Sequence, residues 1–259
     1  MKIEEQCYEI LTDISENAEK ELRLIESAGR TCYKSEHGDF ERCKSFVRNI
    51  IAQGHESVLE HSLLTVKITT ARSISHQLVR HRLCAFSQES QRYCNYSKDK
   101  FNNEITVIRP TEFADDSSFD DWCESCLTAE HSYFSMLSKG LKPEVARSVL
   151  PNCTKTELVM SANYREWRHV LKERTSSRAD PAMRKLMGSL LAELHSKIPV
   201  VFDDIKDNSS LHEVDKEALI ELKRLAETRL RDRQFNKMTF DISAKDLQFL
   251  GANEENEDT

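Results

Sequence analysis

The segment RHRLCAFSQESQRY, residues 80–93, gathers side chains that bind anions. It carries three arginines and one histidine, although the formal net charge of the chain is −7. Arginine forks form bidentate contacts with phosphate and with paired carbonyl oxygens, such as those of a pyrimidine ring. The interleaved serines and glutamines add neutral hydrogen-bonding groups, and Phe86 and Tyr93 add stacking surfaces. The segment predicts a site for a small phosphate-bearing ligand, with a nucleotide as the best fit, and its alternative is a solvated basic turn.

Two further arginines stand among apolar residues. Arg147 lies in VARSVLP, and Arg174 ends the helical segment 163–174. At about 100° per residue, an offset of eleven returns to nearly the same side of a helix, so Asn163, Leu171 and Arg174 share a face. An unpaired buried guanidinium is costly, so Arg174 requires an anion or hydrogen-bond acceptors. A salt bridge to a core carboxylate, or a side chain that extends to solvent, would also satisfy it.

His55 and His61 in HESVLEH invite comparison with a zinc site. Zinc hydrolases place two histidines at i and i+4 of one helix, whereas the spacing here is six, which puts them on nearly opposite sides. Cys123 and Cys126 form a close pair without a second pair, so a half-buried helix face explains them better than a zinc site. We expect no metal, and a metal-dependent hydrolase is the weakest alternative.

Length and composition are those of a soluble globular protein with one large domain, or one domain with an appendage. The chain has 259 residues, of which 39% are hydrophobic and 31% charged. The first residues lack a secretory signal, no apolar segment approaches the roughly 20 residues that span a bilayer, and the cysteines should remain thiols. We therefore expect a cytoplasmic protein without a membrane partner. The acidic balance argues against a nucleic-acid partner, because such binding relies on an extended positive surface.

Periodicity predicts the elements that hold these residues. Leu64, Val66 and Ile68 alternate with polar residues, as in a half-buried strand, and 181–198 shows the apolar stripe of a core helix. The predicted strands are 7–11, 64–68, 106–110 and 155–163. The predicted helices are 16–28, 40–53, 71–82, a helix capped by Ser117 or Ser118 and ending near Lys139, 143–150, 164–174 and 181–198, with a polar loop at 29–39. Residues 209–259 hold 12 acidic and 8 basic side chains and read as a charged extension.

Five motifs resemble those of the flavin-dependent thymidylate synthases. The first is Arg80-His81-Arg82, seven residues and then Ser90. The others are GRTCYKSE at 29–36, GHESVLEH at 54–61, ARSVLP at 146–151 and NYREWRHVLKERTSS at 163–177. The resemblance covers roughly residues 1–205. It implies an α+β fold with a mixed sheet flanked by helices, assembled as a homotetramer with shared active sites. It also implies a catalytic domain at 1–208 and leaves the extension at 209–259 without a function.

The resemblance implies a reductive methylation of dUMP to dTMP. Methylenetetrahydrofolate supplies the one-carbon unit, NADPH reduces bound FAD, and the reduced flavin returns a hydride to the methylene-bearing nucleotide. The implied partners are therefore these small molecules and further copies of the chain. In this family no enzyme cysteine attacks the uracil ring, so none of the eight cysteines is expected to act as a nucleophile.

The resemblance also implies two sets of site residues. The set for dUMP is Gln77, Arg80, Gln88, Glu89, Ser90, Gln91, Arg92, Arg147 and Arg174. The set for FAD is His55, Ser57, Arg80, His81, Arg82, Leu83, Gln88, Asn163, Arg165 and His169. Ser90 and Arg92 are implied to hold the phosphate. Arg174 is the implied catalytic residue, because it grips the uracil edge and favours the ionised ring, a charge-stabilising role.

A few positions depart from the family pattern. Gln88 stands where many relatives have glutamate, and Glu173 replaces an apolar residue. Asp180 and Ala182 lie where histidine or glutamine is frequent. The departures motivate a second hypothesis, a non-catalytic nucleotide-binding or regulatory protein on the same scaffold. Such a protein would bind dUMP without turnover.

Overall fold

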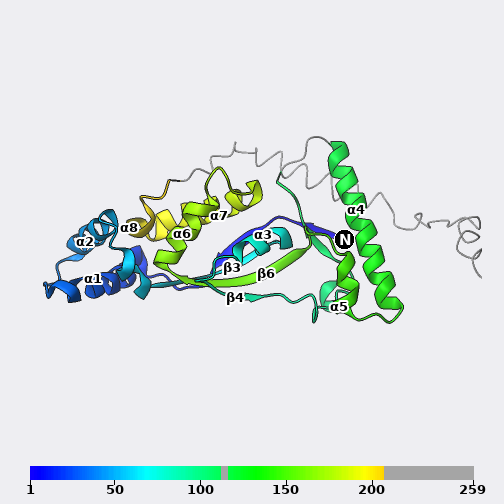
Figure 1. The fold of residues 1–259 in the computed structure, drawn as a ribbon, viewed down its shortest axis with the longest axis horizontal. Coiled ribbons are helices and arrows are strands. Elements are labelled where there is room, and N and C mark those ends of the chain that lie inside the picture. Colours follow the sequence, from blue (N-terminus) through cyan, green and yellow to red (C-terminus); the bar gives the residue numbers. More distant parts are fainter. Residues whose placement is uncertain (112–115, 207–259) are drawn as a thin grey trace, which may run out of the picture. The chain divides into compact units, whose positions relative to one another are not determined.

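A four-stranded antiparallel sheet is the framework that positions the residues above. The structure is a computed structural model that describes residues 1–111 and 116–206. The strand order is β2-β3-β6-β4, and each neighbouring pair is antiparallel (Figure 1). The strands are β2 (Cys7–Ile10), β3 (Leu63–Ala71), β6 (Lys155–Asn163) and β4 (Ala85–Gln88).

A separate two-stranded sheet holds the beginning of the chain. Its strands, β1 (Lys2–Glu4) and β5 (Thr106–Ile108), are parallel. The α+β class expected from the sequence is confirmed, but the single mixed sheet is wrong, because the parallel pair and the antiparallel strands form two sheets. The physical reason is that β1 and β2, which follow each other in the chain, pair with different strands. β1 pairs with β5, and β2 pairs with β3, so the two strands belong to different sheets.

Side chains on β3 and β6 are buried at every second position, and these buried residues form one side of the main core. The two strands pair over their full length, from Leu63 opposite Asn163 to Ala71 opposite Lys155. Successive side chains of a strand point to opposite faces, and the buried face of β3 carries Leu64, Val66 and Ile68. The predicted strands at 64–68 and 155–163 are therefore confirmed.

Three helices cover the buried face of this sheet. They are α3 (Arg72–Leu78), α6 (Tyr164–Arg174) and α7 (Pro181–Lys197), and their apolar residues join those of β3 and β6 in one core cluster (Figure 1). Trp167 of α6 is fully buried, and its Nε1 donates to the carbonyl of Leu64 at 2.9 Å. This bond attaches α6 to β3 on its Trp167 side, so the polar side of the helix faces away from the sheet.

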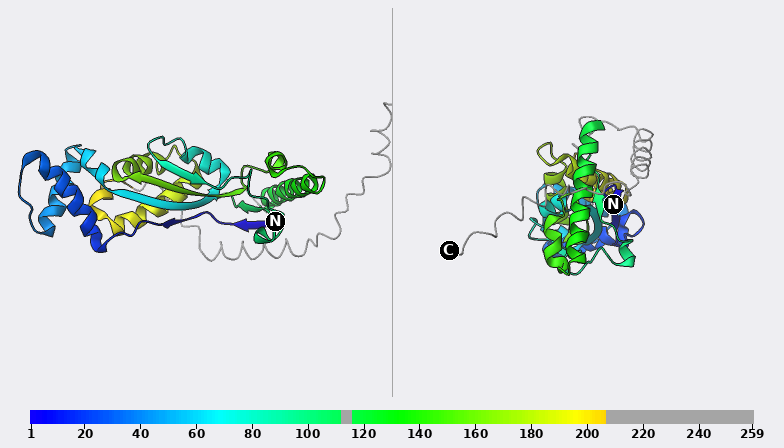
Figure 2. Two further views of the ribbon diagram at one scale, coloured as in Figure 1. Left: turned by 90° about the horizontal axis from the view of Figure 1, so that it is seen from below. Right: turned by 90° about the vertical axis from the view of Figure 1, so that its right-hand side faces the viewer.

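Helices also gather at both ends of the main sheet. One end holds α1 (Glu19–Tyr33), α2 (Phe40–Ala52) and α8 (Pro199–Phe202), and the other holds α4 (Asp116–Ser138), α5 (Pro143–Ala146) and the 3-10 helix η4 (Arg147–Val149) (Figures 1 and 2). Short 3-10 helices occur at η1 (Glu16–Ala18), η2 (Glu56–His61) and η3 (Asp99–Phe101). Cys123 and Cys126 are buried on α4, which confirms the helix-face interpretation.

Helix α1 is longer than the sequence predicts. The predicted loop at 29–39 is wrong for residues 29–33, which are helical. Gly29 allows this continuation, because a Cβ there would lie 2.8 Å from the Cδ1 of Ile50, so the absent side chain lets α1 pack closely on α2. The buried carboxylate of Glu26 accepts from Arg30 Nε at 2.7 Å across one turn and supports the same extension.

Two further features differ from the sequence predictions, and a third prediction concerns residues that the structure does not describe. Residues 85–88 form strand β4, which is not among the predicted strands. The described part of α4 begins at Asp116, so Ser117 and Ser118 are helical and do not cap it. The charged extension at 209–259 lies outside the described residues. In the part of the chain that the structure describes, no helix combines the length and apolar character needed to cross a membrane.

Candidate active site

The Arg80-His81-Arg82 segment follows directly after α3. The helix ends at Leu78, and the amide of His81 donates to the carbonyl of Leu78 at 3.0 Å, which turns the chain. The turn buries His81, which is 7% exposed, and leaves Arg80 and Arg82 exposed on either side of it. The chain then enters β4, which pairs with β6. The segment is therefore held between the end of a helix and an edge strand.

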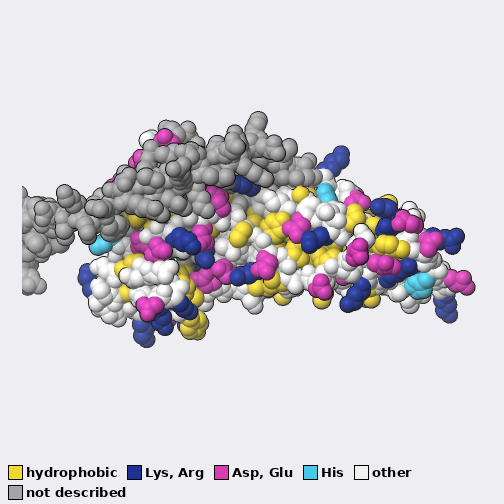
Figure 3. All heavy atoms as spheres, turned by 180° about the vertical axis from the view of Figure 1, so that it is seen from behind, with side chains coloured by type: hydrophobic (Ala, Val, Ile, Leu, Met, Phe, Trp, Pro, Cys, Tyr) yellow, Lys and Arg dark blue, Asp and Glu magenta, His cyan; other side chains and the backbone are white. Residues whose placement is uncertain are grey.

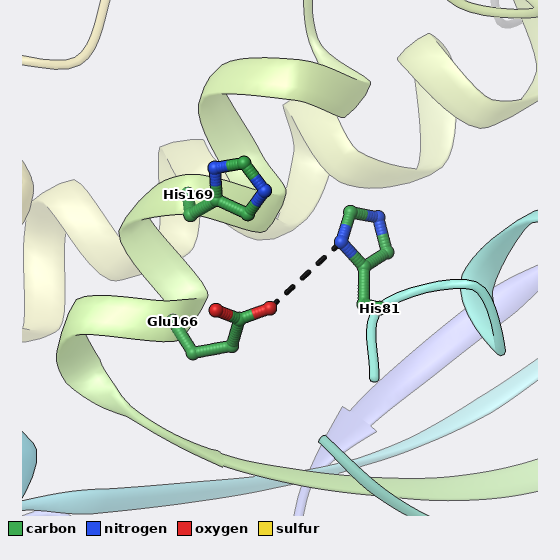
Figure 4. A group of neighbouring side chains, drawn as sticks. All are labelled: His81, Glu166 and His169. Carbon is green, nitrogen blue, oxygen red and sulfur yellow. Dashed lines mark ion pairs between the residues drawn. The ribbon is translucent and has the colours of Figure 1, made fainter. Parts of the chain in front are cut away.

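Helix α6 supplies the groups that face His81. Asn163 caps this helix, because its side chain accepts a hydrogen bond from the amide of Glu166 at 2.9 Å. Residues three apart share a helix face, so Glu166, His169 and Lys172 follow one another along α6. Figure 4 shows Glu166 and His169 on this helix, with His81 on the facing segment.

A cavity of about 980 Å³ lies between these segments. It is large enough for a cofactor or a nucleotide. Its lining residues are Glu56, Glu60, Arg80, His81, Arg82, Leu83, Asn163, Arg165, Glu166, His169 and Lys172. The structure therefore brings together seven of the ten residues predicted for the cofactor, although they lie in two segments far apart in the sequence.

The charges around the cavity favour an anionic ligand. Arg165 Nη1 lies 2.6 Å from Glu60 Oε1, and Lys172 Nζ lies 3.9 Å from Glu56 Oε1, so these cations have carboxylate neighbours. Arg80 and Arg82 form no ion pair with any described residue. Two guanidinium groups at the rim are thus available to a phosphate.

Arg174 does not line this cavity but bonds to His81, which does. Its Nε donates to His81 Nε2 at 2.9 Å, and its Nη2 donates to the carbonyl of Gln77 at 3.2 Å. The half-buried Arg174 therefore meets its need for acceptors with neutral groups. Burial, together with the charges of Arg174 and His169, lowers the pKa of His81 to about 4. His81 is consequently neutral near pH 7 and accepts the bond from Arg174.

His81, Glu166 and His169 also have the composition of a metal site. Their nearest ligand atoms all lie within 4.8 Å of one another. Arg174 opposes such a use, because its positive charge lies beside His81 and its donor occupies the lone pair of Nε2. The proton of the neutral ring must then sit on Nδ1, the nitrogen nearest Glu166, which removes a metal ligand. His55 and His61 do not belong to this group among the described residues.

A second cluster contains arginines predicted for the nucleotide. Arg92 Nε lies 3.7 Å from the carboxylate of Glu144, and Arg147 Nε donates to the backbone carbonyl of Glu144 at 3.4 Å. The two arginines come from the loop after β4 and from η4, and they approach the same residue. None of Ser90, Arg92 and Arg147 lines the cavity described above.

The segment between the two clusters is fixed by its own hydrogen bonds. The side-chain nitrogen Nε2 of Gln88 donates to Ser75 Oγ and to Thr156 Oγ1, at 2.9 and 3.1 Å. Glu89 Oε1 accepts from the hydroxyl of Tyr96 at 2.8 Å. Gln91 is different, because it is 7% exposed and its amide nitrogen has no hydrogen-bond partner among the described residues. A buried donor without a partner is costly, so Gln91 is the member of this segment that most needs a ligand.

Some site residues were missed by sequence reasoning. Glu56, Glu60, Glu166 and Lys172 line the cavity but were not predicted to do so. The signal for Glu166 and Lys172 is present, since they stand three residues before and after His169 on one helix. His55 and Ser57 were predicted but do not line the cavity, whereas Glu56 between them does.

Comparison with known proteins identifies the family. The model of the family described as thymidylate synthase complementing protein matches residues 13–200. The flavin-dependent thymidylate synthase of Corynebacterium aurimucosum is 35% identical over 214 residues, which cover 74% of this chain and 83% of the relative. The flavin-dependent thymidylate synthase of Mycobacterium sp. strain JLS is 36% identical, over 73% of this chain and 82% of the relative.

Solved structures show the same fold at lower identity. The UMP/dUMP methylase PolB from Streptomyces cacaoi, bound with 5-Br dUMP, superposes with a TM-score of 0.65 at 18% identity and covers 78% of this chain and 96% of its own. The same protein bound with 5-Br UMP gives a TM-score of 0.63. With the family match over most of the described residues, and a cavity walled by the Arg80-His81-Arg82 and Asn163–Arg174 motifs, the chain belongs to the flavin-dependent thymidylate synthase family.

Proposed function

We propose that this protein methylates dUMP to dTMP, with methylenetetrahydrofolate as the one-carbon donor and NADPH as the reductant of a bound FAD. One observation carries the proposal. Arg80, His81 and Arg82 all line the cavity, and His81 Nε2 accepts a hydrogen bond from Arg174 Nε at 2.9 Å. The side chain of His81 thus connects the proposed cofactor site to the arginine proposed to stabilise charge.

The cavity residues fit a flavin dinucleotide. The volume of about 980 Å³ accommodates more than a single ring system. The diphosphate of FAD needs cations, and Arg80 and Arg82 supply guanidinium groups without ion pairs among the described residues. Leu83, Asn163, Arg165 and His169 of the proposed FAD set also line the cavity, whereas its members His55, Ser57 and Gln88 do not. When bound, the flavin supplies the hydride that completes the methyl group.

The chain's own residues bind and polarise the nucleotide. Ser90, Arg92 and Arg147 hold the phosphate, which is supported by the approach of both arginines to Glu144. Gln77, Glu89 and Gln91 belong to the proposed nucleotide set, and the side-chain nitrogen of Gln91, which has no hydrogen-bond partner among the described residues, supports a ligand there. Arg174 stabilises the negative charge that develops on the uracil ring. Its remaining donors have no hydrogen-bond partner within residues 1–111 and 116–206 and can serve this purpose.

We further propose a homotetramer in the cytoplasm, without metal or nucleic acid. Leu83 and Tyr93 are 80% and 77% exposed, although both belong to the motif segment, and a neighbouring subunit would cover such apolar surface. Figure 3 shows Lys and Arg interspersed with Asp and Glu on the visible face outside the grey residues, a distribution that suits small ligands better than a polyanion.

The bound cofactor provides the first test. The purified full-length protein is expected to be yellow, and denaturation should release FAD in amounts close to one per chain. NADPH should bleach the flavin absorbance under anaerobic conditions, because the cofactor is reduced in place. A colourless, well-folded protein that does not take up added FAD would contradict the cofactor assignment.

The second hypothesis, a regulatory protein that only binds dUMP, makes a different prediction. It was motivated by Glu173, Asp180 and Ala182, and in the structure Glu173 is exposed and Asp180 caps α7 by accepting from the amide of Ala182 at 2.9 Å. Asp180 and Ala182 therefore have a local structural role, and Glu173 contributes an exposed charge next to Arg174. A binder would show dUMP affinity without dTMP formation, whereas the proposed enzyme shows both.

A further inference from the structure

Among the described residues, one side-chain acceptor holds Arg174. Its hydrogen-bond partners in this part of the chain are His81 Nε2 and the backbone carbonyl of Gln77, at 2.9 and 3.2 Å. The backbone carbonyl is fixed by the chain. The imidazole is not, because a neutral histidine carries its proton on either nitrogen, and only one of the two forms accepts at Nε2.

Glu166 lies on the other side of the same imidazole. Its Oε1 is 3.9 Å from His81 Nδ1, and both side chains are buried, at 9% and 7% exposure (Figure 4). A carboxylate attracts an N–H dipole and repels a lone pair, and the attraction is strong where water is excluded. Glu166 therefore favours the form of His81 with the proton on Nδ1, which is the form that accepts from Arg174.

Glu166 is itself held in place. Its amide donates to the capping side chain of Asn163 at 2.9 Å, and its Oε1 accepts from the thiol of Cys84 at 3.8 Å. Burial, followed by the charge of Glu166, raises the pKa of Cys84 to about 12, so Cys84 stays a neutral thiol that donates. The backbone of Glu166 is thus held by Asn163, and its carboxylate is held by Cys84. A group that orients another side chain must itself be held in this way.

We propose that Glu166 is a positioning residue for Arg174, which it orients by selecting the Nδ1-protonated form of His81. The inference rests on the proposed function, because it gives Arg174 its catalytic role. The arrangement follows the general logic in which a carboxylate fixes the protonation form of a histidine, which then serves the reacting group. Glu166 and His81 orient the guanidinium in this interpretation, and no metal enters it.

The test compares three variants of the full-length, flavin-loaded protein. Glu166→Ala removes the carboxylate, Glu166→Gln keeps a side-chain oxygen that can face Nδ1, and Glu41→Ala removes a carboxylate of α2 that is 79% exposed, as a control. At saturating dUMP, kcat is expected to fall by about 10- to 100-fold in Glu166→Ala. Recovery of most of this loss is expected in Glu166→Gln, and little change in Glu41→Ala. The KM for dUMP should change less than kcat.

A spectroscopic readout separates this role from a merely structural one. Nitrogen-15 NMR of histidine-labelled protein, with the His81 signals assigned through His81→Gln, should show an unprotonated Nε2 in the unchanged protein. It should show a mixture of the two forms in Glu166→Ala. An Nε2-protonated His81 in the unchanged protein, or an unaltered kcat in a Glu166→Ala protein that retains flavin, would overturn the inference. Absence of dTMP formation by the unchanged protein would instead refute the proposed function, and the NMR comparison would still decide the role of Glu166.

Discussion

Arg174→Ala is expected to lower kcat for dTMP formation by about 10²- to 10³-fold, the usual cost of removing one group that stabilises developing charge. In the structure this arginine is half-buried, and its hydrogen-bond partners among the described residues are neutral acceptors, His81 Nε2 and the carbonyl of Gln77. In the proposed complex its charge is therefore available to the uracil ring. Steady-state kinetics with dUMP, methylenetetrahydrofolate and NADPH measures the effect.

A conservative variant shows which property of Arg174 matters. Arg174→Lys keeps the charge but loses the planar fork that bonds to His81 and that, in the proposed complex, also bonds to the substrate. Its kcat should lie between those of the unchanged protein and Arg174→Ala, with flavin content preserved in both variants. An Arg174→Ala protein with unchanged kcat would remove the arginine from the mechanism, and a protein with no turnover in any form would support the dUMP-binding hypothesis.

Arg168→Ala is expected to lower the free energy of unfolding by about 3 kcal/mol, because it removes a fully buried guanidinium that donates to two partly exposed carboxylates and a backbone carbonyl. Arg168 is 1% exposed and donates to Glu56 Oε1 at 3.0 Å, to Asp204 Oδ2 at 2.7 Å and to the carbonyl of Val201. It ties η2, which borders the cavity, to the chain after α8. Flavin affinity should fall as well, since Glu56 lines the cavity.

A neighbouring ion pair provides the control for this loss. Asp203 pairs with Arg48 at 3.6 Å, but both side chains are about half exposed, at 43% and 52%. Arg48→Ala should change the unfolding free energy by less than about 1 kcal/mol. Urea denaturation of both variants measures the difference, and equal losses would show that burial does not set the energy of the Arg168 network.

The Arg168 network also has an expected pH dependence. Burial opposes ionisation of Asp204, but the Arg168 hydrogen bonds outweigh it and hold the pKa of Asp204 below its ordinary value of 3.8. The pKa is lowered in the folded state, so the stabilisation is fully present above pH 3.8 and is lost as the pH falls below it.

Local patterns predicted those elements that are decided by local forces. The alternation in β3 and the apolar stripe of α7 follow from burial of one face, and both are visible in a single segment. The length of α1 was underestimated, because residues 29–33 are helical owing to the packing of Gly29 against α2, which is a tertiary contact. Strand β4 was missed, because its short sequence acquires strand form by pairing with β6.

The candidate site was predictable in its parts but not in its assembly. The motifs identified Arg80, His81 and Arg174, yet His81 and Arg174 stand 93 positions apart in the chain, and nothing local shows that they bond. Glu166 and Arg168 look like ordinary charged residues of a helix, and their roles follow only from what α6 packs against. Sequence alone therefore indicates which residue types are present, whereas the fold decides which of them bond to one another.

Formation of dTMP from dUMP by the purified full-length protein tests the central claim most directly. The protein is supplied with methylenetetrahydrofolate and NADPH, and the nucleotide product is identified by mass spectrometry. The account predicts dTMP that depends on both co-substrates and that is almost lost in Arg174→Ala. A flavin-loaded, folded protein that binds dUMP but leaves it unmethylated under these conditions would contradict the account.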